Sequence, residues 1–372
     1  MKANPRIAMF GSSLVSAYWN GAATYYRGVL GELATCGYDI VFYEPDAYER
    51  QANRDIPDPD WARVCVYQPT REAASRCLEE ASTADIVVKA SGVGVLDDFL
   101  EHEVGQLGGR SLRIFWDVDA PATLERMETD PADPFRSDLR DYDLVLTYGG
   151  GQPVIDAYRA LGARECIPIY NALDPATHHP VPHDPRFDAD LGFLGNRLPD
   201  REARVREFFL EPARHLPRHR FLLGGSGWQS SIDLPGNVNA IGHVFTRDHN
   251  AFNCSPRAVI NINRNSMART GFSPPTRVFE AAGAAACLLC DDWEGLETFL
   301  EPDREVLVVR SGEEVVAQLA SLSAERARQI GAAARRRVMA EHTYAHRARL
   351  LTRLFGERLP APPLRREVSL HA

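Results

Sequence analysis

The sequence predicts an α/β protein with two domains, each built around a parallel β-sheet. Short apolar runs alternate with helical patterns along most of the 372 residues, and such alternation is typical of parallel sheets with helices on both faces. The alternation stops at a proline-rich stretch, residues 174–187, and then starts again. We therefore expect a first domain over residues 1–173, a linker over residues 174–187 and a second domain over residues 188–339.

Each expected strand is a short apolar run next to a turn or a helical pattern. In the first domain these runs lie at residues 6–11, 39–45, 63–69, 84–91, 111–119, 142–150 and 163–174. In the second domain they lie at residues 189–196, 219–228, 237–244, 258–264, 286–293 and 305–311. The last part of the chain, residues 324–355, is basic and helical in pattern. We expect its end, about residues 340–360, to pack back on the first domain.

Composition and charge exclude several classes of protein. The chain is 44% apolar and 25% charged with a net charge of −9, which argues against a nucleic-acid backbone as the main partner. No run approaches the ~20 apolar residues of a membrane span. The seven cysteines are odd in number and irregular in spacing, as expected for reduced thiols. We expect a cytoplasmic protein with no membrane span, and no bound cofactor or metal triad.

The residues that follow the strands are the first place to look for a binding site. Ligands of open parallel sheets bind beyond the carboxyl ends of the strands, and two such sheets facing each other make a cleft. In the first domain, Asp117 and Asp119 follow one strand, and Pro121 then begins a helix. Each aspartate has two interpretations: a helix cap, or a general base or hydroxyl-binding group for an acceptor substrate.

In the second domain, the stretch GFSPPTRVFE places Arg277 and Glu280 on the first turns of an expected helix. Ser273 is a possible cap for that helix. A cation near a helix N-terminus is normally unfavourable, so Arg277 there suggests a bound anion. Glu280 lies one turn further on the same side. A nucleoside diphosphate with its ribose would satisfy both groups. The alternative is an exposed ion pair contributing less than about 1 kcal/mol.

Other residues at strand ends of the second domain could complete a site for the donor of a transferred group. Arg197 and Arg201 lie near a helix start, where an arginine can bind a phosphate bidentately, although a surface role is the competing interpretation. The remaining candidates are small or polar groups that directly follow expected strands: Gly195, Asn196, Gly225, His243 and Arg264.

Several motifs together resemble a known family. These are WDVDAPATL, LTYGGG, NALDPATHHP, LGFLGNR, the stretch from Asn261 to Leu300, and EHTYAHRARLL. They look like the CgeB-like spore-maturation glycosyltransferases. The resemblance implies a GT-B fold, with two Rossmann-like domains and an inter-domain cleft. It also implies that the first domain binds the acceptor and the second binds a nucleotide sugar.

At the level of residues, the resemblance implies that Glu280 holds the donor ribose. It also implies that Gly195, Asn196 and Arg197 form a loop beside the diphosphate. Retaining GT-B enzymes carry an acid where this chain has Phe272, so inversion and retention both stay open.

The sequence therefore favours a metal-independent, hexosyltransferase-like enzyme that moves a sugar from a nucleoside-diphosphate sugar to an acceptor it does not identify. Asp119 is the first candidate for a base, with Asp117 as its competitor. A nucleotide-sugar epimerase and a catalytically inactive binding protein are the two alternatives.

Overall fold

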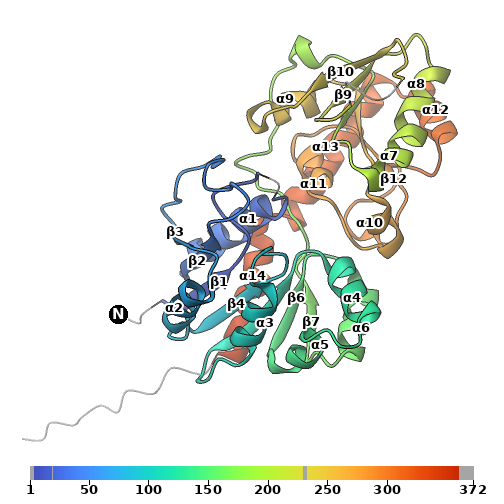
Figure 1. Cartoon of the computed structure of the whole chain (residues 1–372). Helices are drawn as coiled ribbons and strands as arrows, with labels where there is room; N and C mark the ends of the chain where they lie inside the picture. The colour runs from blue at the N-terminus through green and yellow to red at the C-terminus, as the bar shows by residue number, and fades with distance from the viewer. Residues whose placement is uncertain (1–3, 19, 229–232, 360–372) are drawn as a thin grey trace, which may run out of the picture.

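The computed structural model describes residues 4–18, 20–228 and 233–359, which form two α/β domains (Figure 1). The first sheet has seven strands in the order β3-β2-β1-β4-β5-β6-β7, and all neighbouring strands are parallel. Its strands are β1 (Arg6–Phe10), β2 (Asp39–Pro45), β3 (Ala62–Tyr67), β4 (Ile86–Ala90), β5 (Leu112–Asp117), β6 (Leu144–Thr147) and β7 (Cys166–Pro168). The helices that follow these strands are α1 (Ala22–Thr35), α2 (Arg71–Ala81), α3 (Asp97–Gly105), α4 (Ala120–Thr129), α5 (Phe135–Asp138) and α6 (Gly151–Ala160).

The second sheet has six parallel strands in the order β10-β9-β8-β11-β12-β13. These are β8 (Leu191–Leu194), β9 (Phe221–Gly224), β10 (Val238–Gly242), β11 (Ala258–Asn261), β12 (Leu288–Asp291) and β13 (Leu307–Val309). The helices of this half are α7 (Pro199–Val205), α8 (Glu211–His215), α9 (His249–Cys254), α10 (Asn265–Thr270), α11 (Thr276–Gly283), α12 (Gly312–Ser321) and α13 (Ala324–Glu341). The predicted class, two parallel α/β sheets, is confirmed.

Each sheet is buried on both faces because its apolar side chains alternate between two cores. In β1, Ile7 and Met9 belong to one hydrophobic cluster, whereas Ala8 and Phe10 belong to the cluster on the other face. In β12 of the second sheet, Leu289 faces one core, and its neighbours Leu288 and Cys290 face the other. Strands covered on both faces read as continuous apolar runs, which explains why the sequence showed them so clearly.

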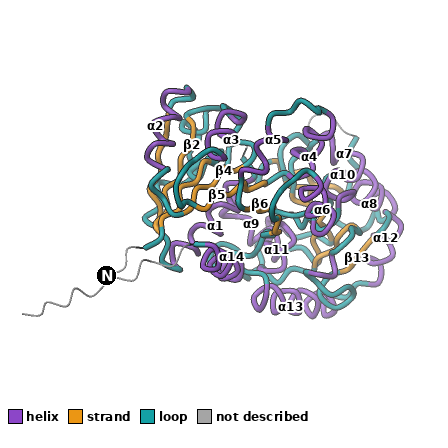
Figure 2. The backbone as a smooth tube through the Cα atoms, turned by 90° about the horizontal axis from the view of Figure 1, so that it is seen from below, coloured by secondary structure: helices purple, strands orange, loops and turns teal. Residues whose placement is uncertain are grey.

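The C-terminal helical part is divided between the two halves of the molecule. Helix α13 packs in the core of the second sheet, and α14 (Tyr344–Arg358) packs beside α1 in the core of the first. Figure 1 shows α14 in red among the blue elements, and Figure 2 shows it next to α1 from another direction. The break falls at His342 and Thr343, where the side chain of Thr343 caps α14.

The two segments that cross between the halves are hydrogen-bonded to each other. The backbone N–H of Leu173 donates to His342 O at 2.8 Å, and Tyr344 N–H donates to Leu173 O at 3.0 Å. Arg347 of α14 adds bonds to the carbonyl oxygens of Tyr170 (3.1 Å) and Asn171 (3.2 Å). The outgoing and returning chains therefore form one paired crossing.

The described helices include none with both the length and the apolar character needed to cross a bilayer.

We expect Leu351→Ala to destabilise the protein by about 2–5 kcal/mol, since Leu351 of α14 is fully buried and truncation leaves a cavity. Urea unfolding followed by circular dichroism measures the change. Arg353→Ala, on the exposed side of the same helix, is the matched control and should stay within about 0.5 kcal/mol of the parent protein. Equal midpoints for the two variants would show that α14 adds little to the first core.

Candidate functional site

The carboxyl ends of the two sheets meet in the middle of the molecule. Gly150, which follows β6, donates its backbone N–H to Phe272 O at 2.8 Å. Asn171, which follows β7, donates its side-chain amide to Pro274 O at 3.1 Å. Both acceptors belong to the loop between α10 and α11 of the second half. The loops after the strands of each sheet therefore lie against one another, where parallel sheets bind ligands.

Helix α11 brings Arg277 and Glu280 to this meeting point. Arg277 lies in its first turn and Glu280 one turn later, as the spacing predicted. Burial lowers the pKa of Arg277, and Glu280 counteracts this effect. Burial alone would raise the pKa of Glu280, but His178, Arg277 and His249 outweigh burial and hold it below its usual value. Glu280 therefore stays ionised in a half-buried site with positive surroundings.

Three arginines from three different elements surround the same space. Arg201 of α7, Arg264 beside α10 and Arg277 of α11 interact electrostatically. Burial, together with the charges of Arg277 and Arg264, lowers the pKa of Arg201 to about 10. Arg264 forms a long ion pair with Asp200, 3.4 Å between Nε and Oδ2. In the part of the chain that the structure describes, the guanidiniums of Arg201 and Arg277 have no hydrogen bond or ion pair.

Neighbouring guanidiniums repel one another. Asp200 and Asp291 oppose this effect on Arg201, but its pKa still falls. A dianionic group placed between the guanidiniums would relieve the repulsion and accept several charge-assisted hydrogen bonds. The three arginines are therefore chemically suited to an anion.

Two glycines create the space for Arg201. A Cβ on Gly195 would lie 2.7 Å from an Arg201 guanidinium nitrogen. A Cβ on Gly225, whose φ is +121°, would lie only 2.2 Å from the carbonyl oxygen of Gly195. Asn196 holds the neighbouring turn, because its side-chain oxygen accepts the Ser226 N–H at 3.0 Å. These predicted residues thus shape the loops after β8 and β9.

The structure gives three further predicted residues of this half these surroundings. Arg197 points to Glu202, with 2.7 Å between Nε and the carboxylate, so Arg201 is the arginine that joins the cluster. Ser273 is buried, but α11 has Pro275 at its N-cap position and no side-chain cap. His243 is exposed and packs edge-on against Phe245, with 4.8 Å between ring centroids.

Asp117 is a structural residue, contrary to its prediction as a possible catalytic group. It is fully buried, and Oδ1 accepts hydrogen bonds from Ser91 (2.7 Å), the Asp119 N–H (2.9 Å) and Thr123 (3.1 Å). The hydroxyl of Tyr158 donates to its other oxygen. With both oxygens occupied by internal donors, this carboxylate holds β5, α4 and α6 together and has no access to a substrate.

Asp119 has a different environment although it lies only two residues away. Its side chain is exposed, occupies the N-cap position of α4 and makes no capping bond. Nearby protein atoms and the charge of Asp117 raise its pKa, while Arg264 of the second half opposes the rise. Tyr148, after β6, is electrostatically coupled to Asp119, Arg264 and Glu280. Asp119 therefore faces the arginine cluster from the first sheet.

Two histidines that the sequence analysis did not select lie beside Glu280. Ligand atoms of His178, His249 and Glu280 all fall within 4.8 Å of one another, whereas we expected no such triad. His178 comes from the stretch between the two sheets. No local sequence pattern links it to His249 and Glu280, which lie 71 and 102 positions later. Arg201 is already one of the two possible phosphate-binding arginines in the sequence, and like Arg277 it puts a cation in the first turn of a helix.

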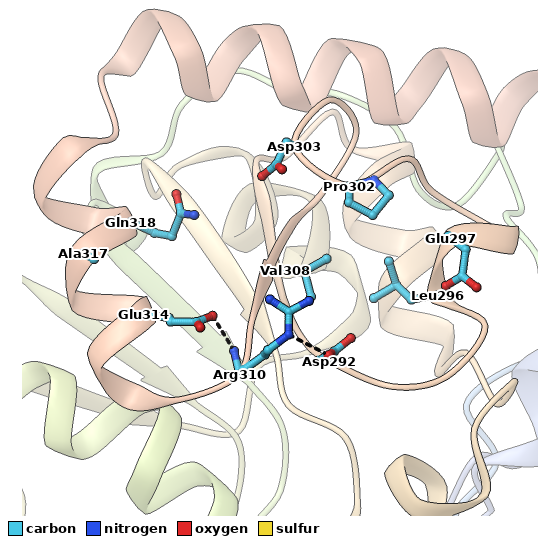
Figure 3. A pocket seen from close by; sticks show the side chains of 10 residues that line it. All are labelled: Asp292, Leu296, Glu297, Pro302, Asp303, Val308, Arg310, Glu314, Ala317 and Gln318. Atoms are coloured by element: carbon cyan, nitrogen blue, oxygen red, sulfur yellow. Dashed lines mark hydrogen bonds and ion pairs between the residues drawn. The ribbon is translucent and has the colours of Figure 1, made fainter.

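A cavity separate from the arginine cluster lies beside the last two strands of the second sheet. It has a volume of about 440 Å³ and is lined by residues that follow β12 and β13 and by α12. Figure 3 shows Arg310 among the lining residues, with its guanidinium paired to Asp292 and its backbone N–H donating to Glu314. It shares no residue with the arginine cluster, and its one arginine already has carboxylate partners.

We expect Asp117→Ala to destabilise the protein by about 3 kcal/mol or more, because several buried donors lose their acceptor and each costs about 1–3 kcal/mol. Asp119→Ala, the matched control, should change stability by less than about 1 kcal/mol, since its carboxylate makes no capping bond. Thermal unfolding of both variants measures the contrast. An Asp117→Ala protein as stable as the parent would contradict the structural role.

Comparisons with known proteins agree with the two-sheet architecture. Residues 201–353 match a family described as glycosyl transferase-like. Among curated proteins, no sequence relative matches the chain. Solved structures of similar fold include sucrose-phosphate synthase from Thermosynechococcus elongatus, with 14% identity, a TM-score of 0.68, and coverage of 95% of this chain and 98% of that one.

Two further structures were solved with nucleotide or nucleotide sugar. Anabaena HepE in complex with UDP and glucose has 10% identity, a TM-score of 0.65, and coverage of 95% of this chain and 100% of that one. T4 phage BGT in complex with its UDP-glucose substrate has 10% identity, a TM-score of 0.58, and coverage of 96% and 100%. The chain therefore has the GT-B fold, and its residues 201–353 match the glycosyl transferase-like family.

Proposed function

We propose that this protein is a glycosyltransferase that moves a hexosyl group from a nucleoside-diphosphate sugar to an acceptor bound by the first domain. The observation that carries the proposal is the convergence of Arg201, Arg264 and Arg277 beside Glu280, opposite Asp119. In this proposal the three arginines bind the diphosphate and Glu280 binds the ribose. Asp119, on the opposite side, contacts the acceptor hydroxyl. The CgeB-like motifs of the sequence support the same assignment.

The arginines would act mainly on the leaving group. When the glycosidic bond breaks, negative charge develops on the nucleoside diphosphate, and preorganised cations stabilise that charge in the transition state. Three guanidiniums supply enough positive charge for this role, so we propose that transfer needs no catalytic metal. Because HepE and BGT were solved with UDP or UDP-glucose, UDP-hexoses are the donors to test first.

Asp119 would contact the acceptor. Its raised pKa makes it a stronger base than an ordinary aspartate, which suits proton removal from a hydroxyl. An inverting reaction requires such a base, whereas in a retaining reaction Asp119 would anchor the hydroxyl. An epimerase or an inactive binding protein would share the donor site without needing Asp119. Incubation with UDP-glucose in the absence of acceptor separates these classes by epimerisation, slow hydrolysis or binding alone.

We expect Arg201→Met to weaken UDP binding by roughly 10- to 150-fold, the loss of about 1.5–3 kcal/mol from a charged hydrogen bond. The same substitution should raise the stability of the ligand-free protein, because the folded state disfavours the charged form of Arg201. Arg197→Met, which breaks only a partly exposed ion pair, should leave affinity within about twofold. Calorimetry and thermal unfolding measure the two effects, and a destabilised Arg201→Met protein with normal UDP affinity would refute the role.

We expect Asp119→Asn to bind UDP-glucose normally but to lose transfer. A general base contributes about 10²–10⁴ in rate, whereas a hydroxyl anchor would mainly raise the KM for the acceptor. Steady-state kinetics with any accepted hydroxyl substrate distinguishes the two outcomes. Transfer at the parent rate and KM would remove Asp119 from the site.

A further inference from the structure

We propose that His178, His249 and Glu280 form a binding site for a divalent transition-metal ion, with zinc as the expected species. Their ligand atoms lie within 4.8 Å of one another, and they come from the linker, from α9 and from α11. Two imidazole nitrogens and one carboxylate oxygen are a ligand set that zinc accepts, with a further position left for water. Calcium and magnesium prefer oxygen ligands and are disfavoured here.

The protein holds the two histidines in place through Asn250. Its side-chain oxygen accepts the His179 N–H at 3.2 Å, and its amide donates to Thr177 O at 2.9 Å. Asn250 is the residue after His249, so these bonds fasten the turn that carries His178 to the start of α9. Helix α11, which carries Glu280, also packs closely against this turn. A side chain at Gly283 of α11 would place its Cβ only 3.0 Å from the carbonyl oxygen of His178.

The remaining ring nitrogens already have partners, which leaves one nitrogen of each histidine for a ligand. His178 Nδ1 lies 3.0 Å from Thr177 Oγ1, while its buried Nε2 has no hydrogen-bond partner among the described residues. That Nε2 is 4.0 Å from Glu280 Oε1. His249 Nε2 lies 3.3 Å from Val244 O, so its Nδ1 is the free atom. Metal-binding histidines are commonly oriented through their second nitrogen in this way.

An unpartnered nitrogen on a side chain only 6% exposed requires a physical explanation. A metal ion would supply it, since zinc holds nitrogen and oxygen at about 2.0–2.2 Å, and rotation of the Glu280 side chain would close the remaining distance. Arg277 also interacts with Glu280 and reduces its attraction for a cation. We therefore expect micromolar rather than nanomolar affinity for zinc.

The site would regulate donor binding. This consequence, unlike metal binding itself, rests on the proposed function, in which Glu280 holds the donor ribose. An ion that occupies Glu280 would exclude the ribose, and by linkage the nucleotide would weaken zinc binding by the same factor. Zinc is then an inhibitor that competes with the nucleotide sugar.

The test is zinc titration of the full chain after chelator treatment, followed by calorimetry and, with cobalt, by visible absorption. We expect one ion per chain in the parent protein and in the control His179→Ala, whose exposed side chain lies next to His178. His178→Ala, and independently His249→Asn, should lower zinc affinity by about 10- to 100-fold, with folding checked by circular dichroism. Glu280→Gln should lower the affinity for zinc and for UDP alike.

The metal site is overturned if the parent protein binds zinc no more tightly than the His178→Ala and His249→Asn variants do. If those two variants instead lose UDP affinity, the histidines belong to the nucleotide site, and the proposed function stands without the metal. If zinc binds as expected but UDP binds neither to the parent protein nor to any variant, the metal site stands and the proposed function fails. UDP affinity of the parent that is independent of zinc would refute the competition alone.

Discussion

The rest of the structure depends on the paired crossing between the two halves. Leu173 bonds to His342 and Tyr344 on either side, so the chain leaving the first sheet and the chain returning to it are fixed to each other. The side chain of Leu173 belongs to the core of the second half, whereas that of Tyr344 belongs to the core of the first. The pairing ties the two halves together beside the candidate site, whose residues lie on helices and loops that follow the strands of both sheets.

The candidate donor site is built from charges that do not suit one another in the absence of a ligand. The pKa of Arg201 falls to about 10 because burial and two other arginines disfavour its charged form. A folded protein tolerates such an arrangement only when other contacts outweigh it, and perturbed groups of this kind cluster at functional sites. A bound diphosphate would relieve this repulsion, so that the relief would contribute to the binding energy.

Asp117 and Asp119 show how far identical side chains can diverge within two residues. The strand pattern predicted both positions at the carboxyl end of β5, and the structure has them there. One carboxylate is saturated by Ser91, Thr123 and Tyr158, which come from three separate segments of the chain. The other has no such donors and faces Arg264. Sequence spacing cannot separate the two, since the donors that decide the matter are distant in the chain.

The sequence by itself determined the two parallel sheets and the placing of Arg277 and Glu280 one turn apart on one helix. Both follow from local periodicity, because strands buried on both faces are continuous apolar runs and helical neighbours repeat every turn. Only the tertiary structure decided that Arg201 lies near Arg264 and Arg277 while Arg197 pairs with Glu202. It also decided that Asp117 is buried and that His178 and His249 lie beside Glu280. Those choices depend on which loops meet across the crossing, and contacts between distant segments leave no periodic signal in the chain.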